Sequence, residues 1–459
     1  MSEKTIGKDV AEAAGIFQHL EEICLNSIRE VLPDRIIDQG CREVGHRYRK
    51  RTLTPIVTVF HMLLSALWPE DSFAAGWQTF WASVVGRFPD KAGSSPTLGS
   101  VAKARARLPL SLWSWLFAWI STQAQELSEQ FACWRGHRLV LMDGSCVSMP
   151  DVRDLHAEFG TSTGRYGKGK YPLARLVTVC LAGTMTVLGY ALGRYRDDEN
   201  ALAEPLLKKL RRGDLLIADR HFAGAHLYNK YQAAGLEFLT RAHQRLKISR
   251  LGRIISYAGN DFVTDLLVDP AHRRANPCAP KQVRVRLIQA VLRIRGRRQV
   301  VWFVTSLLDG DLYPAEEIVA LYGARWRIET LFRQVKIELS ADVLRSQTAA
   351  GVRKEIAARL IALNVVRIIM LESAIEHEVD PVRISFIHTV RAILSFAPAF
   401  ATEPLWKLPQ IYKAMLTEIA SHPVPERVGR LEPRAVRRET KHYPTLRTTR
   451  AQWRRRYAA

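Results

Sequence analysis

The sequence is short of acidic residues, of closely spaced cysteines and of long apolar runs, and each shortage excludes a class of protein. Its 45 Asp and Glu stand against 67 Lys and Arg, which gives a formal charge of +22. Its six cysteines are scattered and form no Cys-x-x-Cys pair, which argues against a zinc site of the usual spacing and against a disulfide-stapled secreted fold. Residues 1–20 lack the apolar core of a secretory signal, and the most apolar windows, 108–120 and 176–192, do not suit a membrane span. We therefore expect a cytoplasmic protein without a membrane part.

The excess of basic residues favours a polyanionic partner, most often nucleic acid; a basic surface without a role is the alternative. Residues 241–300 hold 14 Lys and Arg against three Asp. Within them, apolar and basic residues alternate over 283–294, with Arg284 and Arg286 among the basic ones, which predicts an antiparallel ribbon with a basic face. The last 38 residues carry 11 Lys and Arg, three Glu and four Pro, so an extended or disordered tail is predicted there.

Apolar periodicity divides the chain into helical ends and a mixed centre. Helical spacing dominates the first 135 residues, whereas a β-β-β-α-β-α-β order follows from residue 136. This order predicts an α/β fold with a mixed sheet and helices packed on it. The expected organisation is a helical N-terminal domain (1–135), a catalytic core (136–243 and 301–345), a basic β insertion (244–300), a helical C-terminal region (346–421) and a basic tail (422–459).

Two aspartates stand at or near the ends of apolar strands. Asp143 follows Leu-Val-Leu-Met, and Asp219 follows Leu-Leu-Ile-Ala. Carboxylates at the carboxyl ends of strands in an α/β sheet face the crevice where ligands bind. A turn or helix-capping role is the alternative for each aspartate. The same capping role is expected for the acidic run 197–199, which precedes a helix.

A long helix is predicted from Ala315 to about Leu339, and one of its faces is chemically mixed. At about 100° per residue, four polar residues fall within about 60° of one another. These four are Tyr322, Arg325, Glu329 and Lys336. The opposite side is expected to be buried through Trp326, Ile328, Leu331, Phe332 and Val335. An exposed helix laced by ion pairs, such as Arg325 with Glu329 at i,i+4, is the alternative.

Three carboxylates that converge in a strongly basic protein indicate a metal site for phosphate chemistry. Oxygen ligands suit Mg²⁺ or Mn²⁺. Two such ions about 4 Å apart activate an attacking oxygen and stabilise a leaving one. Asp143, Asp219 and Glu329 are the candidate ligands.

At this point the sequence resembles the DDE-type transposases of bacterial insertion sequences, which have an RNase H-like core. The helix matches the spacing Y-x2-R-x3-E-x6-K, which is the signature of the Tyr-Arg-Glu-Lys group. Asp143 in Asp-Gly-Ser matches the first acid of the family, and Asp219 in Asp-Arg-His-Phe matches the second. The family usually has Gly where this chain has His221, which is a departure. The resemblance covers about residues 20–400.

The resemblance implies a role for each of these residues. Asp143, Asp219 and Glu329 would bind two Mg²⁺ ions, with Mn²⁺ as a substitute, for cleavage and strand transfer at the ends of the element. Tyr322, Arg325 and Lys336 would contact phosphates near the cut. The insertion would contact the transposon end through Arg284 and Arg286. Trp302 lies on the strand before Thr-Ser and would stack on a flipped base, or else pack in the core.

The partners implied are the terminal inverted repeats of the element and target DNA, bound by a homodimer on paired ends. The N-terminal helical domain would bind DNA, and the helices after Gly351 would form the dimer surface. The protein would associate with the bacterial nucleoid when it is bound to DNA. Two alternatives stay open: a binding protein of transposase descent, and a nuclease with the same core that cuts without joining.

Overall fold

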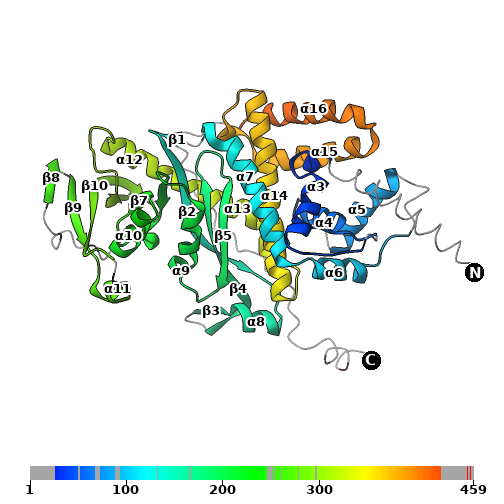
Figure 1. The fold of residues 1–459 in the computed structure, drawn as a ribbon, viewed down its shortest axis with the longest axis horizontal. Coiled ribbons are helices and arrows are strands. Elements are labelled where there is room, and N and C mark those ends of the chain that lie inside the picture. Colours follow the sequence, from blue (N-terminus) through cyan, green and yellow to red (C-terminus); the bar gives the residue numbers. More distant parts are fainter. Residues whose placement is uncertain are drawn as a thin grey trace, which may run out of the picture.

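The structure of the protein is a computed structural model, and it divides into a sheet part and a helical part that pack side by side (Figure 1). It describes residues 26–49, 52–67, 73–87, 94–131, 133–164, 167–243, 254–258, 260–275, 279–294 and 297–424, with a few single residues besides. The basic tail predicted for 422–459 therefore lies almost wholly outside the described residues.

One mixed sheet of 11 strands runs through the first part, in the order β3-β4-β2-β6-β7-β11-β10-β9-β8, with β1 paired to β2 and β5 to β4. At its centre, β2 is antiparallel to β4 and parallel to β6, and β6 is parallel to β7. The prediction of an α/β fold with a mixed sheet is thereby confirmed. The strands are β1 (Cys133–Trp134), β2 (His137–Ser148), β3 (Thr161–Gly164), β4 (Gly167–Leu181), β5 (Val187–Arg194), β6 (Leu215–Ala218), β7 (Glu237–Arg241), β8 (Ile254–Ala258), β9 (Asp261–Leu267), β10 (Gln282–Ile294) and β11 (Arg297–Thr305).

The basic insertion extends this sheet. Strands β8, β9 and β10 pair in sequence and join β11, whose last residues pair with β7. The insertion thus forms the far edge of the core sheet, at the left of Figure 1. Short helix α11 (Pro270–Ala275) links β9 to β10.

Helices cover both faces of the sheet because alternate strand residues are apolar on both sides. One core contains Val140, Met142 and residues of α9 (Glu199–Ala203) and α10 (Ala225–Ala233). The other core contains Leu141 and residues of the helical part. The remaining short elements of the core are α8 (Arg153–Phe159), η2 (Glu204–Lys209) and η3 (Arg220–Phe222).

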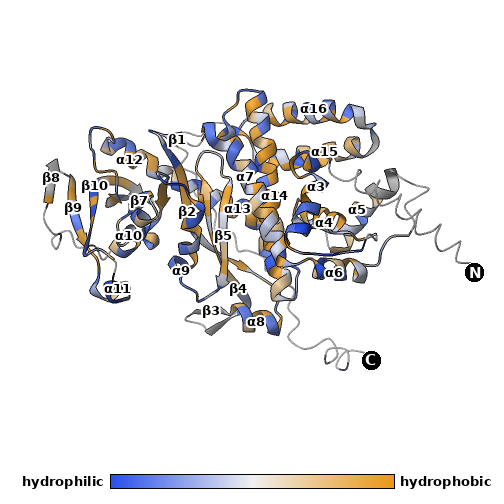
Figure 2. Ribbon diagram, viewed as in Figure 1, coloured by the Kyte–Doolittle hydropathy of each residue, from blue (hydrophilic) through white to orange (hydrophobic). Residues whose placement is uncertain are grey.

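Helix α14 (Ala349–Glu376) is the axis of the helical part, and helices from both ends of the chain pack around it (Figure 1). Most residues between Val352 and Ala374 are buried, and much of the side of the helix seen in Figure 2 is hydrophobic, as expected of a central helix. The other helices of this part are α2 (Asn26–Val31), α3 (Asp34–Glu43), α4 (Pro55–Leu67), α5 (Phe73–Arg87), α6 (Leu98–Arg107), α7 (Leu110–Ser128), α15 (Phe386–Thr402) and α16 (Leu408–Ala420). Because α14 is enclosed, the surface expected for dimerisation after Gly351 is not offered by this helix.

The helical part also shields an edge of the sheet. Asn364 of α14 accepts from the backbone amide of Val187 and donates to its carbonyl, both at 2.9 Å. Ser121 of α7 donates to the same carbonyl at 2.9 Å. These bonds engage the open edge of β5, which would otherwise be free to pair with another strand. None of the helices in the described ranges is long and apolar enough to span a membrane.

Candidate functional site

The register of three parallel strands places three charged residues in a row. Met142 of β2 lies opposite Ala218 of β6, and Ala218 lies opposite Thr240 of β7. The next residue on each strand or just after it is Asp143, Asp219 and Arg241. Residues that follow paired positions on neighbouring parallel strands point to the same face of the sheet. These three side chains therefore lie together at the carboxyl edge of the sheet.

The helix that carries the Tyr-Arg-Glu-Lys spacing packs on that same face, but it is not one regular α-helix. It runs as α12 (Ala315–Tyr322), a 3₁₀ turn η5 (Gly323–Arg325), α13 (Trp326–Arg333) and a π turn η6 (Gln334–Glu338). The regular helix expected over 315–339 is therefore corrected. The ring of Tyr322 packs 4.8 Å from that of Phe303, which faces the helix from β11.

Arg325 joins the strand and helix parts of the site. Its Nη1 lies 3.6 Å from Oδ2 of Asp143, and its Nη2 donates to Oε1 of Glu329 at 3.2 Å. Its guanidinium carbon also lies 5.9 Å from the centroid of the Tyr322 ring. The predicted i,i+4 pair of Arg325 and Glu329 thus exists, but it belongs to a cluster that also includes Asp143.

The surroundings of the site shift the pKa of two of its groups. The pKa of Asp143 is raised to about 6, chiefly by burial and also by the charges of Asp219 and Glu199, while the amide of Gly144 and the charge of Arg325 oppose the shift. Burial likewise raises the pKa of Tyr322 to about 12, with contributions from both Arg325 and Asp219. A carboxyl group that is buried beside other carboxylates tends to keep its proton, and a metal cation can take the place of that proton.

The donor set suits divalent cations that take oxygen ligands, although the acids are not drawn tightly together. The three carboxylates of Asp143, Asp219 and Glu329 do not all lie within 4.8 Å of one another, since Arg325 lies between two of them. Such a spread is compatible with two ions about 4 Å apart. Two buried polar atoms here, Thr178 Oγ1 opposite Asp143 and Arg325 Nε, have no hydrogen-bond partner in the structure. Both leave hydrogen-bonding capacity for a ligand.

Two further residues of this helix, Lys336 and Trp326, have different surroundings. Lys336 is close enough to Cys146 of β2 for its charge to lower the pKa of that thiol, which burial raises. Trp326 is 60% exposed, and the guanidinium of Arg325 lies 5.5 Å from its ring centroid. The expectation that Trp326 is buried is therefore wrong, because at about 100° per residue Trp326 falls about 40° from Tyr322, on the polar face of the helix.

Two buried arginines of α14 hold the π turn. Arg367 donates to the side-chain oxygen of Gln334, and Arg359 donates to the carbonyl of Leu339 at 2.8 Å. The amide of Leu339 donates to the carbonyl of Gln334, five residues back, at 2.8 Å. The central helix of the helical part thus fixes the end of the helix that carries Glu329 and Lys336.

Sequence reasoning missed a fourth carboxylate at this site. Glu199, at the start of α9, forms an ion pair with Arg175 of β4 and lies 3.7 Å from Nε2 of His221. A Cβ at Gly144 would lie 2.7 Å from Cδ of Glu199, so a larger residue there would displace this carboxylate from its present position. The capping role expected for the acidic run belongs to Asp198, whose side chain accepts from Asn200.

Comparisons with known proteins identify the family of the chain. The sequence model of the transposase DDE domain family matches residues 134–365, slightly more than half of the 459-residue chain. The chain belongs to this family. It is 26% identical over 321 residues to the transposase InsG for insertion sequence element IS4 of Escherichia coli strain K12, covering 68% of this chain and 70% of that protein. It is also 23% identical over 384 residues to the transposase for insertion sequence element IS421 of Escherichia coli, covering 75% of this chain and 91% of that protein. The prediction of a DDE-type insertion-sequence transposase is confirmed at this level.

Within this transposase fold, the two candidates from the insertion, Arg284 and Arg286, and Trp302 of β11 occupy contrasting positions. The Arg284 side chain is 54% exposed, and its Nε donates to Asp265 at 3.0 Å. Arg286 is 2% exposed, and its guanidinium contacts Asp261 and three backbone carbonyls. These are the contacts of a structural arginine, which leave it no free donor for a phosphate. Trp302 is half-buried, with its ring 5.7 Å from that of Phe262, on the sheet face opposite the acids.

Proposed function

We propose that this chain is a transposase of the Tyr-Arg-Glu-Lys group that binds the ends of an insertion element and catalyses metal-dependent cleavage and strand transfer. The observation that carries the proposal is that the strand ends and the helix, which are distant in the sequence, bring their acidic residues to one place. Register places Asp143 beside Asp219, and Arg325 connects Asp143 to Glu329 on the facing helix. A helix that were merely solvent-exposed would not bring its acid to two strand acids.

Asp143, Asp219 and Glu329 would hold two Mg²⁺ ions, with Mn²⁺ as a substitute, and Asp143 is central enough to serve both. When bound, the ions would supply activation of the attacking oxygen and stabilisation of the leaving oxygen. Asp143 must lose its proton before it can act as a ligand, because its pKa is raised to about 6. Cations would also neutralise the acids that now hold Arg325.

Arg325 then becomes available to the scissile phosphate, which it can bind through two parallel N–H donors. Tyr322 and Lys336 flank it and would contact neighbouring phosphates. Trp326, exposed beside Arg325, offers an aromatic surface on which a base at the cut can stack. We do not retain Trp302 or Arg286 in the proposed set of DNA contacts, since one faces away from the acids and the other is fully engaged.

DNA is the proposed partner, both as the terminal inverted repeats of the element and as the target. The helices of residues 1–135 and the basic edge of the sheet around Arg284 would extend the contact along the transposon end. A homodimer would hold the two ends together, as strand transfer of both ends requires. Cleavage and strand transfer would take place at the nucleoid.

The test uses DNA that carries the end of the protein's own element, with Mg²⁺ present. Asp219→Ala should abolish cleavage while binding of the end persists, because a carboxylate that holds a metal is not needed for phosphate contacts. Asp311→Ala, at an exposed acid of a loop, is the matched control and should cleave normally. Unchanged cleavage by Asp219→Ala would refute the assignment. Cleavage by the wild type without joined products would instead favour a nuclease.

A further inference from the structure

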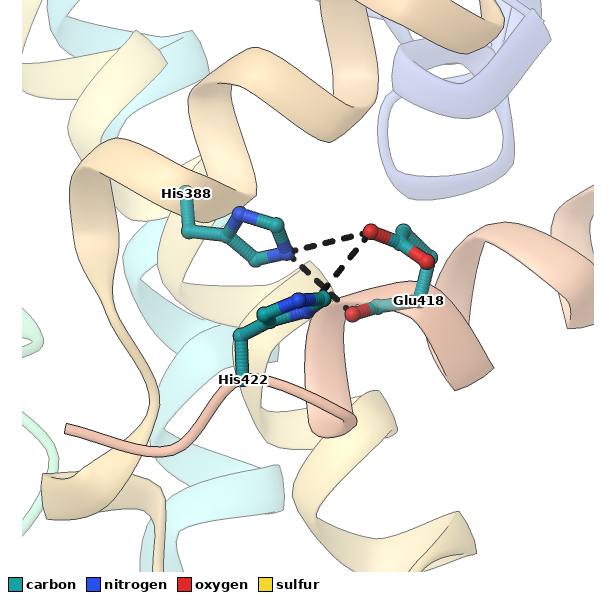
Figure 3. Close-up of side chains that lie close together, drawn as sticks. All are labelled: His388, Glu418 and His422. Carbon is teal, nitrogen blue, oxygen red and sulfur yellow. Dashed lines mark hydrogen bonds and ion pairs between the residues drawn. The ribbon is translucent and has the colours of Figure 1, made fainter. Parts of the chain in front are cut away.

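A second set of metal-binding side chains lies far from the carboxylates, on the helical part (Figure 3). His388 is in the first turn of α15, Glu418 is in the last turn of α16, and His422 follows that helix. One nitrogen of each histidine and one carboxylate oxygen all lie within 4.8 Å of one another. Figure 3 shows both rings directed at the carboxylate.

The separations are those of ligands around one ion. Nε2 of His388 and Nδ1 of His422 each lie 3.6 Å from Oε1 of Glu418. Two ligands at about 2.05 Å from a tetrahedral zinc ion are separated by about 3.4 Å. Direct hydrogen bonds would be much shorter, at about 2.7–3.0 Å.

The polar contacts now made by these atoms are replaceable. Nε2 of His388 lies 3.2 Å from the backbone carbonyl of Glu418, and Nδ1 of His422 lies 2.7 Å from the hydroxyl of Ser421. That hydroxyl also donates to the carbonyl of Glu418 at 2.7 Å. If a cation bound the two histidines, the hydrogen bond from the Ser421 hydroxyl to the carbonyl of Glu418 would remain.

Two imidazoles and one carboxylate select a different cation from the all-oxygen set at the catalytic edge. Imidazole nitrogen suits Zn²⁺ and neighbouring transition metals, whereas Mg²⁺ prefers oxygen. Side-chain exposures of 26%, 44% and 61% for His388, Glu418 and His422 leave a fourth position open to water. The ligand types and the open position fit a zinc ion with three protein ligands.

We propose that His388, Glu418 and His422 bind one zinc ion, which fastens the start of α15 to the end of α16. The same place is already a junction of the chain. Ile384 forms an isolated bridge with Pro423, and the amide of Val424 donates to the carbonyl of Arg383 at 2.6 Å. The ion would therefore hold residues 422–424, with which the basic tail of the sequence begins, against the start of α15.

The test is a titration of the full chain with zinc chloride. Binding is measured by calorimetry and by the change in melting temperature. The wild type should bind one zinc ion at this site and melt at a higher temperature in its presence. His422→Ala and His388→Ala should each weaken that binding at least about tenfold and remove the thermal shift. Excess Mg²⁺ should not compete.

His156→Ala is the matched control, because His156 pairs with one acid, Asp151, at 2.9 Å and has no third ligand. It should bind zinc like the wild type. Free cysteines such as exposed Cys133 also bind zinc, so the comparison among the histidine variants carries the decision. Equal zinc binding by wild type and His388→Ala, or no zinc binding by the wild type, would overturn the proposal.

Discussion

Replacing Asp143 by asparagine should stabilise the metal-free protein at neutral and alkaline pH while it destroys the site. The pKa of Asp143 is raised from 3.8 to about 6, chiefly by burial and secondly by Asp219. Above pH 6 the folded protein must therefore hold a buried charge that the unfolded chain holds in water. At about 1.4 kcal/mol per pKa unit, a shift of about two units is an upper bound of about 3 kcal/mol.

The sign follows from proton binding. Between about pH 4 and 6 the folded state binds more protons at Asp143 than the unfolded state, so stability falls as the pH rises through this window. Above about pH 6 the whole loss of stability is present. Asp143→Asn, which carries no charge, should therefore gain about 1–3 kcal/mol at pH 8 and almost nothing at pH 4.

The assay is the melting temperature with a chelator present, at pH 4 and at pH 8. Asp143→Asn should melt a few degrees above the wild type at pH 8 only. Asp214→Asn is the matched control, because Asp214 is a buried acid with good partners, Arg138 at 2.7 and 2.9 Å. That variant should melt lower at pH 8. An Asp143→Asn protein no more stable than the wild type at pH 8 would refute the reasoning.

Three further outcomes are expected. The affinity for Mg²⁺, followed as a thermal shift, should fall about tenfold from pH 7 to pH 5, because Asp143 becomes protonated; a constant affinity would contradict its role as a ligand. Trp326→Ala should slow DNA cleavage without lowering the melting temperature, whereas Trp302→Ala should lower the melting temperature by loss of packing; the reverse pattern would argue for Trp302 as the stacking residue. Glu199→Gln should reduce cleavage and also stability, since it leaves the cation of Arg175 without its carboxylate, and rescue of stability by the further change Arg175→Gln would identify the pair as the cause.

The sequence predicted the chemistry of the site better than its shape. Asp143, Asp219 and Arg325 could be found because strand ends and helix spacing are local properties of the chain. The irregular helix could not, because its π turn depends on Arg367 and Arg359, more than 20 residues further along. The exposure of Trp326 needs no irregularity, because its position four residues after Tyr322 already places it on the polar face.

Contacts between distant segments account for the other differences. Glu199 packs over Gly144 from a segment that is distant in the chain, which no local pattern around the acidic run reveals. Arg286 has the alternation of a surface arginine, yet it is buried because Asp261 and the turn after β11 surround it. The roles of the three acids in metal binding stay predictions of the motif and the geometry together.

The most direct test of the account asks whether Glu329 is needed for cleavage while its helix stays intact. Glu329→Gln keeps the size and hydrogen-bonding capacity of the side chain but removes the charge that a metal requires. Glu338→Gln, on the same helix, is the control, since Glu338 makes no contact with Asp143 or Arg325 in the structure. With Mg²⁺ and DNA ending in the element terminus, the account predicts that Glu329→Gln binds the end but does not cleave it, while Glu338→Gln cleaves like the wild type. Cleavage by Glu329→Gln at the wild-type rate would contradict it.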